Sequence, residues 1–209
     1  QLRKAITSKT KAIFINSPSN PTGSIYSRSE MKALADVLAD YKNIWILSDE
    51  IYEHIIFEGE HVSIAEFENV RDRVVTINGV SKGYAMTGWR IGYIGAPKCL
   101  VEACNKIQGQ YTSGANSIAQ KAATAALNGD NSCIKKMKDA FAKRRDIIVK
   151  MLSEIDGFKV NMPKGAFYVF PDVSAYYGKS FGEKVIQNSD DFCMFILEEA
   201  HVAIVTGDA

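Results

Sequence analysis

A few residues in the first half of the chain have types and spacing that suit one kind of chemistry. Lys82 lies in the run Ser-Lys-Gly-Tyr-Ala-Met-Thr-Gly-Trp-Arg, which ends at Arg90, and Asp49 and Tyr52 lie upstream in Ser-Asp-Glu-Ile-Tyr. A lysine amine can hold an aldehyde as a Schiff base, and a carboxylate can pair with a pyridinium nitrogen. A tyrosine hydroxyl can donate to a phenolic oxygen, and an arginine can bind a phosphate. Together these residues suit a lysine-bound pyridoxal 5'-phosphate.

Each of these residues also has a simpler interpretation when it is taken alone. Most lysines are solvated surface residues, and Asp49 has the type and position of an N-cap in a strand-to-helix turn. Tyr52 is equally typical of a packing residue with a solvated hydroxyl, and an arginine that opens a strand, as Arg90 does, is usually solvated. The hypothesis therefore depends on the combination and spacing of the residues.

Two further residues complete the predicted site. Asn20 lies in Ser-Pro-Ser-Asn-Pro-Thr-Gly, where prolines and a glycine restrict the backbone and can aim an amide, although the same pattern is common in ordinary turns. Ser81 offers a hydroxyl for the phosphate. We expect Lys82 to anchor the cofactor and then to move a proton at the substrate α-carbon. The predicted cofactor-binding residues are Asn20, Asp49, Tyr52, Ser81, Lys82 and Arg90.

The elements that must position these residues alternate between short apolar runs and a helical pattern. Ser27 and Glu30 have the spacing of a capping box, and apolar residues at helical intervals follow them. Alternating strands and helices predict an α/β fold with a mainly parallel sheet, whose ligands bind beyond the carboxyl ends of the strands. The predicted strands are Lys11 to Asn16, Ile44 to Ser48, Arg73 to Asn78 and Ile91 to Ala96. Asn20, Asp49 and Lys82 each follow one of them.

Helices dominate the second half of the sequence. We expect one helix from Pro97 to about Leu127, another from Cys133 to Ile155, and a third from Asp190 to Ala200. Two antiparallel strands are predicted at Phe158 to Asn161 and Ala166 to Pro171. Residues 1–135 are assigned to a large domain and residues 136–209 to part of a smaller α+β domain.

Composition excludes several classes of partner. The 209 residues carry 25 basic and 24 acidic side chains, a net charge of +1, so neither nucleic acid nor an anionic membrane is an expected partner. The four cysteines and three histidines have no metal-ligand spacing, which predicts reduced thiols in a cytoplasmic protein and no metal site. No apolar stretch approaches the length of a membrane span.

The motifs resemble those of class I/II pyridoxal-phosphate-dependent aminotransferases, in the subgroup of aspartate and prephenate aminotransferases. The matching segments are residues 17–23, 48–53 and 81–93, then 108–114, 117–121, 144–146, 165–168 and 202–209. The resemblance implies the three-layer α/β/α architecture of fold type I, transfer of an amino group from an amino acid to a 2-oxo acid, and a homodimer in which residues 108–117 face the partner's active site. Two positions depart from the pattern: Gly83 stands where a larger residue is frequent, and Gly79 where some relatives have a phosphate-binding serine.

Two alternatives remain open at this point. The same scaffold supports other reactions, such as β-elimination or aminocyclopropane-carboxylate synthesis, and it also serves as a non-catalytic regulatory module that binds the cofactor. Family members are about twice this long, and the sequence opens at Gln1 without a methionine. We therefore expect an excerpt of a longer protein, which is a poor catalyst alone.

Overall fold

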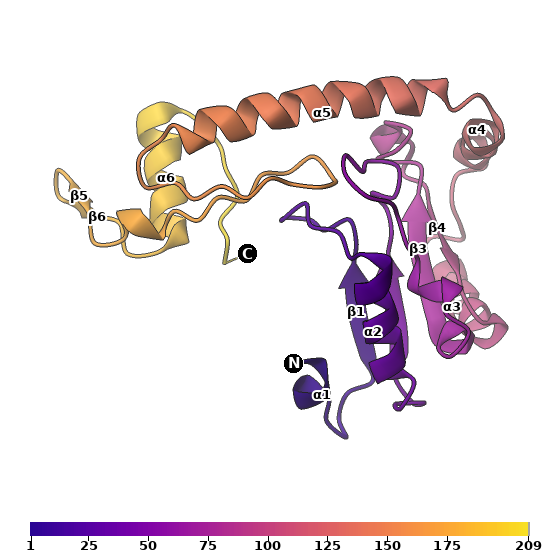
Figure 1. The fold of residues 1–209 in the computed structure, drawn as a ribbon. Coiled ribbons are helices and arrows are strands. Elements are labelled where there is room, and N and C mark those ends of the chain that lie inside the picture. Colours follow the sequence, from indigo (N-terminus) through magenta and orange to yellow (C-terminus); the bar gives the residue numbers. More distant parts are fainter. Residues whose placement is uncertain (209) are drawn as a thin grey trace. The chain divides into compact units, whose positions relative to one another are not determined.

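The computed structural model describes residues 1–208, which form two compact units (Figure 1). The first unit contains Gln1–Lys143 together with Pro163–Tyr168, and the second contains Arg144–Met162 and Val169–Ala209. The division falls within the long helix α5, which spans Ser132–Ser153 and contributes to both units.

A four-stranded sheet forms the centre of the first unit. Strands β1 (Ala12–Asn16), β2 (Trp45–Asp49) and β3 (Val74–Gly79) pair in parallel, and β4 (Gly92–Gly95) is antiparallel to β3. Each strand begins and ends within one residue of its predicted bounds. The α/β fold with a mainly parallel sheet is therefore confirmed.

Helix α2 (Arg28–Leu38) connects β1 to β2 and lies along the sheet (Figure 1). The predicted capping box is present, because the Ser27 hydroxyl accepts from the Glu30 N–H and the Glu30 carboxylate accepts from the Ser27 N–H. Burying a large apolar side chain contributes about 1.5–3 kcal/mol, and this core holds the crossover against the sheet. Its buried residues include Ile15, Met31, Ala35, Leu38, Ile46, Ile64, Val70 and Val74.

The helical region after β4 differs from its prediction as one helix. The structure has two helices there, α3 (Lys98–Tyr111) and α4 (Ser117–Asn128). Ser113 and Gly114 between them have positive φ angles of 61° and 141°, which cannot continue a right-handed helix. Asn116 then caps α4 by accepting from the N–H groups of Ile118 and Ala119. The polar segment that sequence reasoning included in one helix is thus a helix break.

The predicted antiparallel pair at residues 158–171 was also wrong. It is reduced to one isolated bridge between Lys159 and Asp172. The backbone of the intervening segment bonds to other loops instead: the N–H groups of Lys164 and Gly165 both donate to the Gly23 carbonyl, and the Ala166 N–H donates to the Ile55 carbonyl. These bonds make Pro163–Tyr168 part of the first unit.

Short helices complete the first unit. Helix α1 spans Leu2–Ala5, and the 3₁₀ helices η1, η2 and η3 span Ile64–Glu66, Arg71–Arg73 and Thr87–Trp89.

The second unit contains the end of α5, the 3₁₀ helix η4 (Ser174–Tyr176), a two-stranded hairpin and helix α6. Helix α6 spans Ser189–Ala200, which confirms its prediction, whereas the hairpin β5 (Ser180–Phe181) and β6 (Lys184–Val185) was not predicted. Phe192 is buried against the rings of Phe158 and Tyr176.

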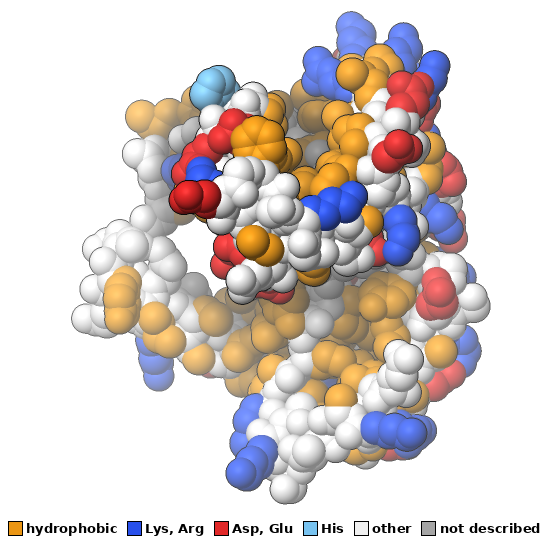
Figure 2. Space-filling model, turned by 90° about the vertical axis from the view of Figure 1, so that its left-hand side faces the viewer, with side chains coloured by type: hydrophobic (Ala, Val, Ile, Leu, Met, Phe, Trp, Pro, Cys, Tyr) orange, Lys and Arg blue, Asp and Glu red, His pale blue; other side chains and the backbone are white. Residues whose placement is uncertain are grey.

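Basic and acidic side chains intermingle with apolar ones on the face drawn in Figure 2, in keeping with the nearly balanced charge of the sequence. Among residues 1–208, no helix combines the length and apolar character needed to cross a membrane.

Candidate active site

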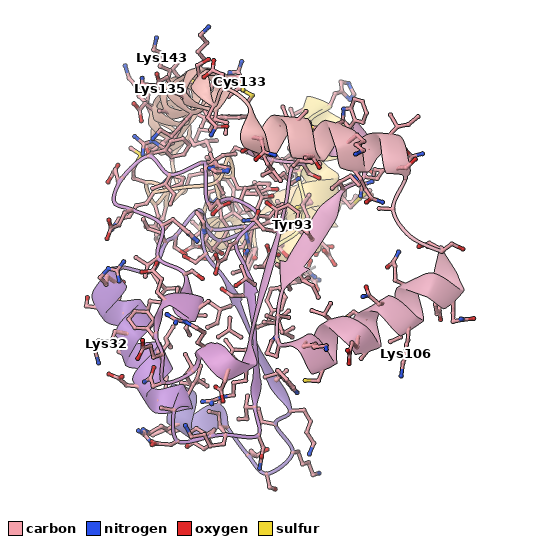
Figure 3. All side chains as sticks on the ribbon, turned by 90° about the vertical axis from the view of Figure 1, so that its right-hand side faces the viewer. Lys32, Tyr93, Lys106, Cys133, Lys135 and Lys143 are labelled. Atoms are coloured by element: carbon pink, nitrogen blue, oxygen red, sulfur yellow. The ribbon has the colours of Figure 1, made fainter. Side chains whose placement is uncertain are left out.

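Lys82 lies on the turn that follows β3 and points toward aromatic rings. Its Nζ atom is 5.8 Å from the centroid of the Tyr52 ring and 5.6 Å from that of Phe167. The residue is half-buried, whereas Lys32 on α2 and Lys106 on α3 are exposed and extend away from their helices (Figure 3). The interpretation of Lys82 as an ordinary solvated surface lysine therefore loses its main support.

Asp49 ends β2 at the carboxyl edge of the sheet, and its carboxylate has few partners. Oδ1 accepts one hydrogen bond from the Ile51 N–H at 3.1 Å, and no ion pair to Asp49 occurs among residues 1–208. The backbone is fixed more firmly, because the Asp49 carbonyl accepts from the Ser17 N–H and from Nδ2 of Asn16. A half-buried carboxylate without a cation is costly, so this geometry favours a ligand cation.

Tyr52 connects Lys82 and Asp49. The residue is only 3% exposed, and its hydroxyl forms a short hydrogen bond with the hydroxyl of Tyr168. Burial raises the pKa of Tyr52 well above its ordinary value, and the Tyr168 hydrogen bond and the charge of Asp49 act in the same direction. Tyr52 therefore keeps its proton and remains a donor over the physiological pH range.

Two residues were missed as site residues by sequence reasoning: Phe167 beside Lys82, and Tyr168 beside Tyr52. Phe167 and Tyr168 follow Ala166, a fully buried residue with a φ of 56°. Phe167 packs edge-on against Tyr52 at 5.4 Å between ring centroids and stacks on Phe141 at 5.2 Å. The Gly-Ala-Phe-Tyr motif was noticed only as a family resemblance, and a separation of 116 residues from Tyr52 hid the contact.

The other predicted residues are less closely connected to Lys82. Asn20 is exposed, and its N–H donates to Oδ1 of Asn16, which ties its loop to the backbone of Asp49. Ser81 is half-buried beside Lys82, and Arg90 is exposed with its Nη1 donating to the Thr87 carbonyl at 2.8 Å. Among the described residues, the side chains of Asn20, Ser81 and Arg90 form no hydrogen bond or ion pair with Lys82, and their assignment to the site stays a prediction.

The turn that carries Lys82 packs closely on His54. A Cβ atom added at Gly83 would lie 2.5 Å from Cδ2 of His54, so the imidazole takes the space of a side chain at this position. The His54 ring also meets Tyr84 edge-on at 5.6 Å. At Gly79, an added Cβ would lie 2.8 Å from the Ile91 carbonyl oxygen. The local packing therefore explains both glycines that depart from the family pattern.

A second charged group lies directly after Asp49. Glu50 is buried, and its carboxylate accepts from the hydroxyls of Ser48 and Ser63 and bonds to Nε2 of His61 at 2.9 Å. Glu50, Glu53 and His61 form a group whose candidate metal-ligating atoms lie within 4.8 Å of one another. Because both Glu50 oxygens already have protein partners, we assign this cluster to structural support.

The pKa values in this cluster reflect the same pairing. Burial raises the pKa of Glu50, but the hydrogen bonds from His61, Ser63 and Ser48 outweigh it and leave the pKa lowered. Burial lowers the pKa of His61, but Glu50 and more distant carboxylates outweigh it and leave the pKa raised. Both shifts favour a charged pair.

The residues around Lys82 fit a pyridoxal phosphate in the chemistry of their donors. Lys82 offers an amine next to aromatic rings, Asp49 offers a carboxylate without an ion-pair partner among the described residues, and Tyr52 offers a hydroxyl that stays protonated. Such groups can bind an aldehyde, a protonated ring nitrogen and a phenolic oxygen, respectively.

Comparison with known proteins identifies the family. Residues 1–209 match the model of one protein family, Aminotransferase class I and II. The chain belongs to this family. This aminotransferase-family chain is 47% identical over 215 residues to the bifunctional aspartate aminotransferase and glutamate/aspartate-prephenate aminotransferase of Petunia hybrida, which covers all of the chain and 44% of that protein. It is 49% identical to a probable aspartate/prephenate aminotransferase of Rhizobium leguminosarum bv. phaseoli, covering all of the chain and 53% of the relative.

A solved structure gives the same result for this member of the aminotransferase family. The crystal structure of the aspartate aminotransferase from Rhizobium meliloti superposes with a TM-score of 0.94 at 43% identity, covering 99% of this chain and 52% of that one. The chain spans about half the length of the curated relatives it matches. The resemblance inferred from the motifs and the fold it implied are confirmed.

Proposed function

We propose that the protein is a pyridoxal-phosphate-dependent aminotransferase that moves an amino group from an amino acid to a 2-oxo acid. Aspartate or glutamate is the proposed donor, in line with the names of its relatives. The observation that carries the proposal is the group around Tyr52: the Lys82 amine lies over its ring, the Asp49 charge acts on its hydroxyl, and neither charged residue has an ion-pair partner among residues 1–208.

Each residue of this group has a proposed role. Pyridoxal phosphate, when bound, supplies an aldehyde that reacts with amines and a ring that accepts electrons. Lys82 anchors the cofactor and then takes a proton from the substrate α-carbon and returns it. Asp49 would pair with a protonated ring nitrogen, and the Tyr52 hydroxyl would donate a hydrogen bond to the phenolic oxygen. Arg90 and Ser81 are proposed to bind the phosphate, and Asn20 to orient the ring.

Replacing Lys82 in the full-length protein tests the proposal. Full-length protein with added pyridoxal phosphate should show a visible absorption band that Lys82→Ala abolishes, and turnover should fall by about 10²–10⁴ or more because a positioned proton carrier is lost. Lys179→Ala is the matched control, since this lysine also lies over a tyrosine ring, 4.8 Å from the centroid of Tyr176. A retained band and unchanged turnover in Lys82→Ala would refute the function.

Product analysis separates transamination from other reactions on the same scaffold. With aspartate and 2-oxoglutarate, an aminotransferase forms oxaloacetate and glutamate in equal amounts. Release of ammonia without glutamate would indicate elimination and contradict the proposed reaction. Binding of the cofactor without any product would favour the regulatory alternative.

We further propose that the full protein acts as a homodimer in the cytoplasm. The segment around residues 108–117 supports the dimer, because Ile107, Tyr111 and Ile118 are 63%, 84% and 71% exposed. Large apolar side chains gathered in this way are typical of an interface. Four free cysteines, three of them exposed, favour a reducing compartment. Sedimentation of the wild type and of Tyr111→Ser would test the dimer, and a monomeric wild type would exclude it.

A further inference from the structure

The contact between Tyr52 and Tyr168 has a consequence for the proposed chemistry. We propose that Tyr168 is a positioning residue whose hydroxyl, when the cofactor is bound, donates a hydrogen bond to the Tyr52 oxygen and so directs the Tyr52 O–H toward the cofactor. This inference rests on the proposed function and extends it to a residue that the sequence motifs do not assign. Tyr168 acts through Tyr52 and needs no contact with the substrate.

The first support is the fixed geometry of the pair. The two hydroxyls share a short hydrogen bond, and the rings meet nearly perpendicular at 5.6 Å between centroids. Tyr52 is 3% exposed, so water has little access to compete for this bond. Backbone hydrogen bonds also join the segment after Tyr52 to the segment before Tyr168. The Ala166 N–H donates to the Ile55 carbonyl at 2.8 Å, and the Phe57 N–H donates to the Lys164 carbonyl at 2.7 Å.

The second support is a count of protons. A tyrosine hydroxyl has one proton to donate and accepts through its lone pairs. If Tyr52 gave its proton to Tyr168, it would have none left for the phenolic oxygen of the cofactor. Only the opposite direction, from Tyr168 to Tyr52, leaves the Tyr52 proton for that ligand. Chains of hydrogen bonds also strengthen one another, so a bond accepted from Tyr168 makes Tyr52 a stronger donor.

The surroundings of Tyr52 keep its hydroxyl a donor. In the cofactor-free chain the hydrogen bond with Tyr168 also raises the pKa of Tyr52, which is the effect of donation by Tyr52, so the proposed direction from Tyr168 to Tyr52 applies when the phenolic oxygen of the cofactor accepts from Tyr52. Asp49 contributes to the high pKa of Tyr52, which keeps the Tyr52 hydroxyl protonated and ready to donate. Lys82 lies over the face of the Tyr52 ring, so the amine that would hold the cofactor is within reach of the same residue. Tyr168 is half-buried in the cluster of Tyr52, Ile55 and Ala166. The hydroxyl of Tyr168 therefore has a function that ring packing alone does not require.

The test uses Tyr168→Phe, which keeps the ring and removes only the hydroxyl. The readout is the pH midpoint of the visible band of the Lys82-bound cofactor, the pH at which the change in the band is half complete. A hydrogen-bond donor at the phenolic oxygen stabilises the deprotonated imine and therefore lowers this midpoint. We expect Tyr168→Phe to raise the midpoint by about 0.5–1 pH unit, the size of one hydrogen bond. We also expect a several-fold lower kcat with little change in KM for the amino acid.

Two comparisons make the result specific. In a Tyr52→Phe background, Tyr168→Phe should cause no additional shift, because Tyr168 acts only through Tyr52. Tyr176→Phe is the matched control, since its hydroxyl also donates a hydrogen bond, to the Asp156 carbonyl in the second unit. This control should leave the midpoint at the wild-type value.

The outcomes separate this inference from the proposed function. An unchanged midpoint in Tyr168→Phe, with only a lower melting temperature, would show that Tyr168 is a packing residue and would overturn the inference while the function stands. An equal shift in the presence and absence of the Tyr52 hydroxyl would also overturn it. Absence of the band in the full-length wild type would refute both the function and the inference.

Discussion

Asp49 and Glu50 are neighbours in the sequence, yet their carboxylates have opposite surroundings. Glu50 is buried and saturated, with two serine hydroxyls and the His61 imidazole as partners. Asp49 is half-buried at the end of β2, and among residues 1–208 its carboxylate accepts a hydrogen bond from the Ile51 N–H alone. A buried charge that the protein pairs itself serves the fold, whereas one that it leaves unpaired is available to a ligand.

The same contrast separates the lysines. Most lysines of the chain are exposed, and several form surface ion pairs, such as Lys32 with Asp36 and Lys135 with Asp139. Lys82 has aromatic rings beside it in place of a carboxylate. Lys82 and Asp49, neither of which has an ion-pair partner among residues 1–208, therefore both interact with Tyr52. A binding site needs such unpaired charges, whereas a folding core does not.

The strongest way to sharpen this comparison is Asp49→Asn. The amide keeps an oxygen for the Ile51 N–H, so the melting temperature of the cofactor-free protein should change little. Turnover should fall by about 10²–10⁴, because the ring nitrogen loses its counter-charge. Steady-state kinetics with aspartate and 2-oxoglutarate measure the effect. A variant with near wild-type turnover would show that Asp49 is a structural cap.

Glu50→Gln should give the reverse result. The substitution leaves the His61 imidazole without its charge partner, and we expect a loss of about 3 kcal/mol in the free energy of unfolding, at the low end for a broken buried pair because His61 is partly exposed. Denaturant titration measures this loss, and the exposed Glu68→Gln is the control. If Glu50→Gln reduced turnover more than Asp49→Asn, the roles of the two carboxylates would be exchanged.

Local patterns predicted the framework of this site well. The capping box of Ser27 and Glu30 and the four apolar runs gave α2 and the strands, because these signals depend on neighbouring residues. The rule that ligands bind at the carboxyl ends of parallel strands then placed Asp49 and Lys82 on one edge.

Contacts between distant segments could not be predicted in the same way. The bond of Tyr52 to Tyr168 depends on the path of residues 163–168, which pair with Gly23 and Ile55 and not with each other as strands. The break between α3 and α4 depends on the positive φ angles of Ser113 and Gly114, and a serine rarely adopts a positive φ. Both features depend on the conformation and contacts of the folded chain, which a local sequence pattern does not reveal.

A smaller effect is expected at the turn that carries Lys82. Gly83→Ala would place a methyl group 2.5 Å from Cδ2 of His54 and 3.1 Å from its Cβ and Cγ, so the ring cannot simply rotate away. We expect a destabilisation of about 1–3 kcal/mol, typical of overpacking, and reduced binding of pyridoxal phosphate as the turn shifts. Denaturant titration and cofactor titration measure the two effects.

A double variant tests whether His54 is the cause. In His54→Ala the added methyl group has room, so Gly83→Ala should cost much less there than in the wild type. Gly88→Ala, in the same loop with no atom within 4 Å of the new Cβ, is the control. Equal costs of Gly83→Ala in both backgrounds would show that its effect comes from the backbone and not from His54.

The pH dependence of stability provides the finest test of the Glu50 pairing. The pKa of Glu50 is lowered from its ordinary value of 4.5, so its stabilising contribution is complete above that pH and is lost as the pH falls through the lowered value. The pKa of His61 is raised from 6.5, with Glu50, Glu53 and Glu66 as the nearby charges, so its contribution is complete below pH 6.5 and is lost as the pH rises through the raised value. The pair should therefore stabilise most between about pH 4.5 and 6.5. The difference in melting temperature between wild type and Glu50→Gln should be largest in that window and shrink toward alkaline pH. A constant difference across pH 5 to 9 would mean that hydrogen bonds, and not charge, hold Glu50 in place.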